Sequence, residues 1–222
     1  ALCTCVNILL SPEIQPVKRR TVFHQLWPSR CALCHIQPAL PQQALCIGCH
    51  HDLPWRLDRL TLPDLEVMVV FEYVWPIDRL LHLFKYQQRL ELLKIFEHGL
   101  KHLPRPEVDA LVAMPAAHAR LRERGYNQAQ LLAQSASQHW QIPLWSGVQR
   151  KRHTDRQQQL NRTQRIANLT HAFAAQSCPP PRLLLIDDVL TTGTTLRTLA
   201  YALQSAGTAE LQAMVIASAK SA

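Results

Sequence analysis

The sequence contains no apolar run that approaches the roughly 18–20 residues needed to cross a lipid bilayer. It contains no Gly-Lys-Thr element, and therefore no Walker loop of the kind that nucleoside triphosphatases use. Its first ten residues are apolar, but they lack the basic leader and the small-residue cleavage site of a secretion signal. We therefore expect a cytoplasmic protein without a transmembrane segment, and peripheral association with the inner face of the cytoplasmic membrane stays open.

Acidic residues are fewer than basic ones, with 16 Asp and Glu against 24 Lys and Arg, a net charge of +8 and a pI near 9.4. This balance favours an anionic partner. Phosphates, nucleic acid and an anionic membrane surface all qualify, and charge alone does not separate them.

The length of 222 residues and the hydrophobic content of 47% suit one large domain, or one domain with a small appendage. We expect residues 1–25 to be a tail, residues 26–60 to be a cysteine-rich module with a connector, and residues 61–222 to be the main domain. Because the chain begins with Ala1 rather than Met, residue 1 need not be the native start.

Four of the seven cysteines form two Cys-x-x-Cys pairs, Cys31 with Cys34 and Cys46 with Cys49. Paired knuckles with a short spacer are typical of zinc ribbons, because each knuckle brings two thiolates to one ion. The alternative is two redox or disulfide pairs. A reduced cytosol favours a structural zinc ion, and such an ion can contribute roughly 10–16 kcal/mol to the folding of a small module.

The segment 183–195 carries the most specific pattern in the chain. Four apolar residues, 183–186, predict a strand buried on both faces, and Asp187 and Asp188 follow at its carboxyl end, where parallel sheets bind ligands. The hydroxyl-rich loop 191–195 then leads into a predicted helix whose free N–H groups favour an anion. The pattern predicts a sugar-phosphate site in which the acids hold ribose hydroxyls or magnesium. The alternative is an ordinary strand and a Thr N-cap.

The rest of the main domain alternates predicted strands with predicted helices, which indicates an α/β fold with a mostly parallel sheet. The predicted strands are 66–73, 109–115 and 211–218, and the predicted helices are 77–86, 90–102, 127–139 and 195–203.

Arginines follow the second of these strands, at Arg120, Arg122 and Arg124. If the strands are parallel, this loop shares a sheet edge with the Asp-Asp loop, and the planar guanidinium forks suit phosphate oxygens. The alternative is a solvated basic loop.

A second basic segment spans residues 150–165. It contains Arg150, Lys151, Arg152, Arg156, Arg162 and Arg165 against the single acid Asp155. A mobile basic loop suits a closing lid or a nucleic-acid backbone. The absence of aromatic rings from residues 146–172 weakens the nucleic-acid interpretation, and a solvated polar helix remains the alternative.

The Asp-Asp loop closely resembles the phosphoribosyl-pyrophosphate (PRPP) motif of type I phosphoribosyltransferases. The resemblance implies that Asp187 and Asp188 hold the ribose hydroxyls. It implies that PRPP binds together with magnesium, and that the arginine loop contacts the pyrophosphate. The residues that it assigns to the 5′-phosphate are Thr191, Thr192, Gly193, Thr194 and Thr195.

Four further elements resemble the ComF/GntX family, which joins an N-terminal four-cysteine module to a phosphoribosyltransferase-like domain. They are Arg124-Gly-Tyr-Asn-Gln128, Leu53-Pro-Trp55 after the second cysteine pair, Phe84-Lys-Tyr86, and the segment from Thr154 through Gln157, Leu160, Arg165 and Asn168 to Phe173. The resemblance covers residues 26–220.

This resemblance implies a competence protein with a PRPP-binding site that assists the uptake or handling of single-stranded DNA during natural transformation. A helicase or a translocation component is the implied protein partner. The alternative is an active phosphoribosyltransferase that acts on an unidentified base. The sequence shows no hood subdomain that would read such a base, and it leaves catalysis, the acceptor and the oligomeric state open.

Overall fold

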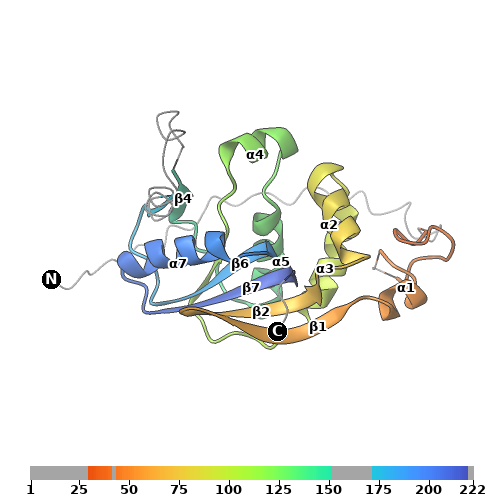
Figure 1. Cartoon of the computed structure of the whole chain (residues 1–222), viewed down its shortest axis with the longest axis horizontal. Coiled ribbons are helices and arrows are strands. Elements are labelled where there is room, and N and C mark those ends of the chain that lie inside the picture. The colour runs from red at the N-terminus through yellow and green to blue at the C-terminus, as the bar shows by residue number, and fades with distance from the viewer. Residues whose placement is uncertain (1–29, 42–43, 152–171, 220–222) are drawn as a thin grey trace.

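A five-stranded sheet with the strand order β1-β2-β7-β6-β3 organises the computed structural model, which describes residues 30–41, 44–151 and 172–219 (Figure 1). The strands are β1 (Trp55–Leu62), β2 (Leu65–Glu72), β3 (Ala110–Ala113), β6 (Arg182–Leu190) and β7 (Glu210–Ser218). Strands β2, β7, β6 and β3 are parallel, and β1 is antiparallel to β2 at the edge. The expected α/β fold with a mostly parallel sheet is therefore confirmed.

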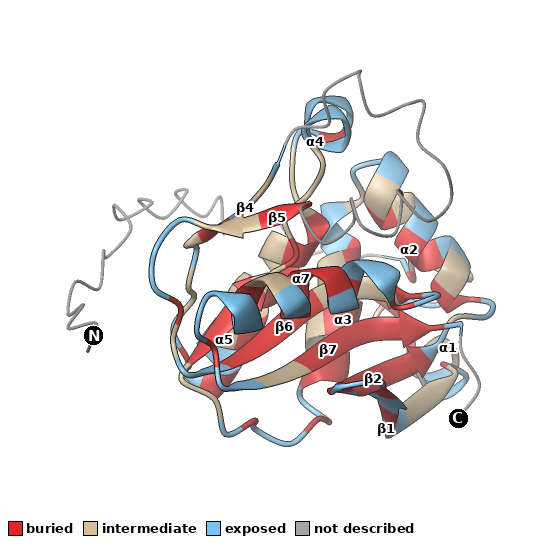
Figure 2. Ribbon diagram, turned by 60° about the vertical axis from the view of Figure 1, so that its left-hand side comes forward, coloured by how far each residue is buried: buried red, intermediate tan, exposed pale blue. Residues whose placement is uncertain are grey.

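Helices cover both faces of the sheet. They are α2 (Ile77–Tyr86), α3 (Leu93–Leu100), α5 (Gln128–Trp140) and α7 (Thr194–Ser205), with a short 3-10 turn at Leu90–Leu92 before α3. Alternate strand residues point to opposite faces. Leu184 and Ile186 pack with α2, α3 and α5, while Leu183 and Leu185 pack with α7. The strands between the two helical layers are accordingly almost wholly buried (Figure 2).

The four-cysteine module precedes β1 and contains one short helix, α1 (Ile47–His51). The chain leaves the module through Leu53-Pro54 and enters β1 at Trp55, whose partner across the ladder is Phe71 near the end of β2. Figure 1 places α1 beyond the carboxyl end of the parallel strands. The module and the Asp-Asp loop therefore lie at the same end of the sheet.

Several short elements complete the described chain. Helix α4 (His118–Arg124) forms where the sequence suggested a loop, and strands β4 (Val148–Arg150) and β5 (Phe173–Ala175) form a small antiparallel ribbon. None of the helices in the described ranges is both long enough and apolar enough to cross a membrane. The predicted tail, residues 1–25, and residues 152–165 of the basic segment lie outside the described residues.

Candidate functional site

The two adjacent acids lie within β6 rather than after it. The strand runs to Leu190, and Asp187 pairs with Val215 of the parallel neighbour β7. The added strand residues carry the carboxyl groups to the end of the sheet, where the loop to α7 begins. The predicted position of the acids at the carboxyl end of a buried strand is thus confirmed, and the strand extends four residues beyond the end of the apolar run.

Asp188 forms an ion pair with Lys85 of α2. Their Oδ2 and Nζ atoms are 2.9 Å apart, and the side chains are only 14% and 18% exposed. Leu184 and Ile186 pack on the α2 side of the sheet, so the alternation along β6 brings Asp188 to the same helix. Lys85 belongs to the Phe84-Lys-Tyr86 motif, but the sequence predicts no role for it, because no local pattern connects residues a hundred positions apart.

Asp187 has a different environment. Burial, and then the charge of Asp188, raises the pKa of Asp187 to about 7, although Lys85 and Arg120 act in the opposite direction. The backbone N–H of Asp188 donates to Oδ1 of Asp187 at 2.9 Å. A carboxyl that titrates near neutrality can accept a hydroxyl hydrogen bond, bind a cation or exchange a proton.

The loop from Thr191 to Thr195 exposes its threonines around one buried glycine. Gly193 has φ +78° and precedes the first residue of α7, and a Cβ atom there would lie 2.8 Å from Leu62 Cδ1. The hydroxyls of Thr192 and Thr194 are 3.0 Å apart. The loop thus presents hydroxyls and the N–H end of a twelve-residue helix at the edge where the two acids lie.

The three arginines of α4 are placed differently from one another. Arg120 lies close enough to Asp187 to lower its pKa, and Arg122 lines a surface hollow. Arg124 is buried, its guanidinium lies 4.6 Å from the ring centre of Tyr86, and it donates to Gln128 at 3.1 Å. Contact with phosphate stays a prediction for Arg120 and Arg122, whereas the partners of Arg124 are within the protein.

Arg150 is a further charged residue at this edge, and from the sequence it was predicted only as part of the basic segment 150–165. Its guanidinium lies 5.5 Å from the ring centre of Phe173. Burial, and then Arg120, lowers the pKa of Arg150, while Asp187 raises it. The adjoining hollow measures about 490 Å³, and its lining is Ala117, His118, Ala119, Leu121, Arg122, Arg150 and Lys151.

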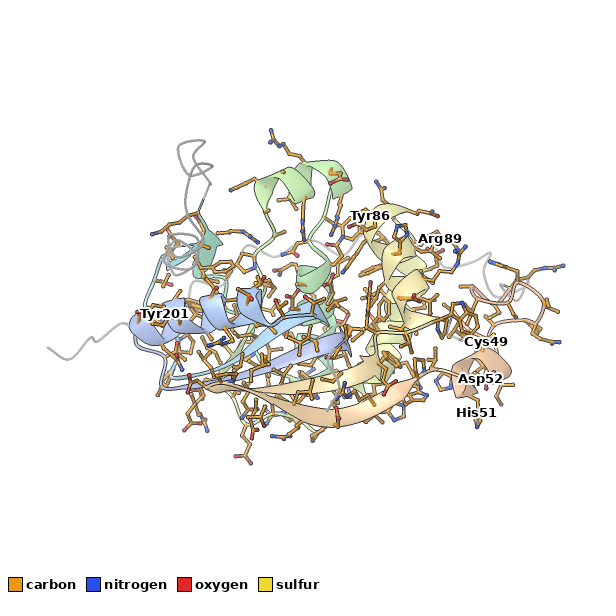
Figure 3. The ribbon with its side chains drawn as sticks, in the orientation of Figure 1. Cys49, His51, Asp52, Tyr86, Arg89 and Tyr201 are labelled. Atoms are coloured by element: carbon orange, nitrogen blue, oxygen red, sulfur yellow. The ribbon has the colours of Figure 1, made fainter. Side chains whose placement is uncertain are left out.

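The Arg-Gly-Tyr-Asn-Gln element holds three parts of the fold together. The Tyr126 hydroxyl donates to the carbonyl of Phe84, at the end of α2 that carries Lys85 and Tyr86 (Figure 3). The Asn127 side chain donates to the Met114 carbonyl at 3.0 Å and accepts from the first turn of α5. Two motifs that are forty residues apart in the sequence therefore form one contact beside the acids.

The four cysteines converge as the spacing predicts. Their Sγ atoms all lie within 4.8 Å of one another, and those of Cys34 and Cys46 are 3.8 Å apart. A tetrahedral ion with Zn–S bonds of about 2.3 Å has sulfur atoms roughly 3.8 Å apart, so the cluster fits zinc. All five cysteines within the described ranges are free thiols, which favours a metal over the disulfide alternative.

The charge state of the thiols also suits a cation. Backbone N–H groups of Gln37 and Ile36 lower the pKa of Cys34 to about 6, which favours a thiolate. Burial and the neighbouring sulfurs raise the pKa of Cys49. Four thiolates at this separation repel one another, and a divalent cation offsets that repulsion.

The sequence was also compared with those of known proteins. No protein-family model matches the chain. "Competence protein F" of Haemophilus influenzae is 34% identical over 169 residues, which cover 69% of this chain and 73% of that protein. "DNA utilization protein YhgH" of Escherichia coli K12 is 29% identical over 216 residues, which cover 83% of this chain and 95% of that protein. The chain belongs to the ComF/GntX family.

YhgH of Salmonella typhi extends the comparison to 218 residues at 28% identity. In this ComF/GntX member, the elements that carry the family resemblance within the described residues lie on one end of the sheet. The Asp-Asp loop, the end of α2 and the α4–α5 turn meet around Asp188, and the cysteine module adjoins them through β1.

Proposed function

We propose that this ComF/GntX protein acts in competence, as one relative's name indicates, through a pocket that binds PRPP or a related nucleotide. The observation that carries the proposal is the meeting of Asp187, Asp188 and Lys85 with a hydroxyl-rich helix N-terminus at the carboxyl end of β6. Acids beside an anion-binding helix end suit a ligand with both ribose hydroxyls and phosphate.

Each part of PRPP has a candidate partner. Asp187 and Asp188 would accept hydrogen bonds from the ribose hydroxyls, and Thr191–Thr195 would hold the 5′-phosphate. Arg120 and Arg150 lie where a pyrophosphate would extend, because both interact electrostatically with Asp187. Magnesium bound with PRPP would neutralise part of the pyrophosphate charge.

The cysteine module stands at the same end of the sheet as this pocket. Across the sheet, Trp55 pairs with Phe71 and Phe71 pairs with Ala217. Ala217 in turn pairs with Val189, the residue after Asp188. A structural zinc ion held by the four cysteines would keep the module folded there. In the phosphoribosyltransferases that the main domain resembles, a hood subdomain reads the base, and in this protein a partner-binding module would stand in its place.

We propose single-stranded DNA as a second, larger ligand, which this protein would bind in the cytoplasm. Arg122, Arg150 and Lys151 line the hollow beside the pocket, and the net charge of +8 favours a polyanion. On the module, Ile36 and Ile47 are 75% and 74% exposed. These isoleucines are the candidate contact for a helicase or a translocation protein.

Calorimetric titration with PRPP and magnesium tests the pocket. We expect binding by the wild type, and loss of at least about tenfold in affinity for Asp187→Asn and for Asp188→Asn, since each change replaces a carboxyl oxygen by an NH2 group that cannot accept from a ribose hydroxyl. Asp109→Asn is the matched control, because Asp109 pairs with Arg182 at the opposite end of the sheet. A wild type that does not bind PRPP ends the proposal.

Salt titration of single-stranded DNA binding tests the second ligand. The affinity should fall linearly on a double-logarithmic plot as salt rises, and a double change of Arg150 and Lys151 to Gln should reduce the slope by about 2. The Asp187→Asn change should leave DNA binding intact, because a carboxylate does not attract phosphate. Equal slopes for the wild type and the double variant would exclude this surface.

An active phosphoribosyltransferase is the second candidate function. A carboxyl with a pKa of about 7 at Asp187 suits a group that accepts a proton from an attacking nitrogen. Release of pyrophosphate from PRPP in the presence of a panel of free bases measures this activity. Binding of PRPP without pyrophosphate release by any base would leave the binding role alone.

A further inference from the structure

Three histidines and one tryptophan meet where the cysteine module joins the main domain. His50 belongs to α1, His98 to α3, and His102 to the turn that follows α3. The ring centres of His50 and His98 are 4.6 Å apart, and those of His98 and His102 are 5.0 Å apart. Trp55, the first residue of β1, lies 4.9 Å from His102 between ring centres. Figure 3 shows the neighbouring Cys49 and Asp52 at this end of the molecule.

The ring nitrogens of His98 and His102 lie at hydrogen-bonding distance, which is also the distance between two ligands of one ion. The two residues are four positions apart and face the same side of the chain, and their Nε2 atoms are 3.3 Å apart. Zinc–imidazole bonds of about 2.0–2.1 Å place two nitrogens of a tetrahedral ion roughly 3.3–3.4 Å apart. The separation of the two side chains is therefore the separation of two ligands on a single ion.

His98 lies partly buried among other imidazole rings. Burial, and then the neighbouring rings of His50 and His102, lowers the pKa of His98. A neutral imidazole is the form that binds metal. The Nε2 atom of His50 is buried without a hydrogen-bond partner within the described part of the chain, so this corner also holds an imidazole nitrogen that no protein group satisfies.

We infer that His98 and His102 form a binding site for a divalent transition-metal ion, separate from the four-cysteine cluster. Within the described ranges only the four cysteines bring three or more ligand atoms within 4.8 Å of one another, so the histidine site supplies two protein ligands. His102 is exposed, and water or a donor from a bound partner can take the remaining positions. The ion would lie at the base of the module.

Nickel is a suitable probe because it prefers imidazole nitrogen and quenches a nearby indole. The experiment uses untagged, full-length protein whose cysteine site is loaded with zinc. Ni²⁺ is added stepwise, and its binding is measured by tryptophan fluorescence and by calorimetry. We expect saturable quenching with one tight Ni²⁺ per chain. The double change His98→Ala and His102→Ala should weaken Ni²⁺ binding by at least roughly 10–100-fold. This is the loss in metal affinity that removal of an outer-shell partner alone causes, and removal of two direct ligands should cost no less.

Two controls locate the ion. His139→Ala removes an imidazole that also lies beside a tryptophan, with 6.1 Å between the ring centres of His139 and Trp140, and it should leave binding unchanged. Trp55→Phe should abolish most of the quenching while calorimetry still shows the ion. Equal Ni²⁺ affinity in the wild type and the double histidine variant would overturn the inference, as would quenching that survives the loss of Trp55.

Discussion

Asp187 and Asp188 are neighbours in the sequence with opposite electrostatic surroundings. Asp188 has a cationic partner at 2.9 Å in Lys85, whereas burial and the charge of Asp188 raise the pKa of Asp187 to about 7. The pair therefore combines an ion-paired carboxyl group at Asp188 with a carboxyl group at Asp187 that titrates near neutral pH.

Replacing each acid by Asn should change stability in opposite directions. The folded pKa of Asp187 lies above its ordinary value of 3.8, so the folded state binds more protons between pH 4 and pH 7, and stability from this group falls as the pH rises through that window. Asp187→Asn should then gain about 1–3 kcal/mol in the free energy of unfolding at pH 8 and nothing near pH 4. Urea denaturation at the two pH values measures the difference.

Asp188→Asn is the matched change. It leaves the ammonium of Lys85 without its partner in a half-buried position, so we expect a loss of about 2–4 kcal/mol at pH 8. If both variants were destabilised equally at pH 8, the two carboxyl groups would share one environment, contrary to the structure.

A comparison of substitutions at Gly193 and Gly125 distinguishes the cost of backbone strain from the cost of a steric clash. Both have positive φ, +78° and +79°, but only at Gly193 would a Cβ atom meet a close neighbour, Leu62 Cδ1. Gly125→Ala should cost about 1 kcal/mol from strain alone, and Gly193→Ala about 2–4 kcal/mol. Thermal unfolding of the two variants measures the gap. Equal losses would mean that Leu62 moves away without cost.

At the residue scale, local pattern identified the acids, the hydroxyl loop and the four cysteines. It did not assign Lys85 or Arg150 to the site, because their roles depend on which helix or ribbon lies beside β6. The surroundings of Arg124 also depend on the fold. The sequence predicts a phosphate contact for Arg124, and the structure places its guanidinium over the ring of Tyr86.

Among the elements, α5 has the clearest start signal. Asn127 accepts from the Ala129 N–H at 3.2 Å as the N-cap, and its amide nitrogen donates to Met114 at the end of β3. One side chain thus sets both the beginning of the helix and its distance from the sheet.

Truncating this cap should loosen the arginine-bearing edge. Asn127→Ala removes both hydrogen bonds, and we expect a loss of about 1–2 kcal/mol in the free energy of unfolding. Asn127→Ser keeps a capping oxygen but cannot reach Met114, so its loss should be smaller. Urea denaturation ranks the variants, and a serine variant as unstable as the alanine variant would show that the contact with Met114 dominates.

The elements that the sequence predicted poorly are those without a periodic apolar pattern. Strand β1 alternates charged and apolar residues and was assigned to the connector, although it pairs with β2 as an edge strand. Helix α4 carries three arginines and only Leu121 as a large apolar residue, so no hydrophobic periodicity announced it. Strands β2 and β7 and helix α2 were predicted within a residue or two, because their hydrophobic patterns are strong, whereas β6 extends past its apolar run through the two acids to Leu190.

For the molecule as a whole, the main sheet has its own core, while the cysteine module is too small to have one. Only Cys31, Ala44, Leu45, Cys46 and Leu53 of the described module are buried apolar residues. We propose that a metal ion held by the four cysteines supplies stability that such a small set of contacts lacks.

Removing zinc should therefore unfold the module and spare the sheet. After treatment with a chelator, we expect amide hydrogen exchange of residues 44–52 to become fast, while β6 and β7 stay protected. Elemental analysis should find one zinc per chain in the wild type and in Cys178→Ser, whose thiol lies outside the cluster, and none in Cys34→Ser. Cooperative loss of protection throughout the sheet would contradict the division into module and domain.

The sequence by itself determined which chemical groups stand together locally: two acids before a hydroxyl loop, and two cysteine knuckles. Each is readable over fewer than about twenty residues because local spacing fixes local geometry, and the α/β alternation is readable along the main domain. Only the tertiary structure decided which charges face one another. Lys85, Arg120 and Arg150 come from three elements separated along the chain, and their approach to β6 depends on strand order and helix packing. The pairing of β1 with β2 likewise brought the cysteine module to the end of the sheet that carries the acids.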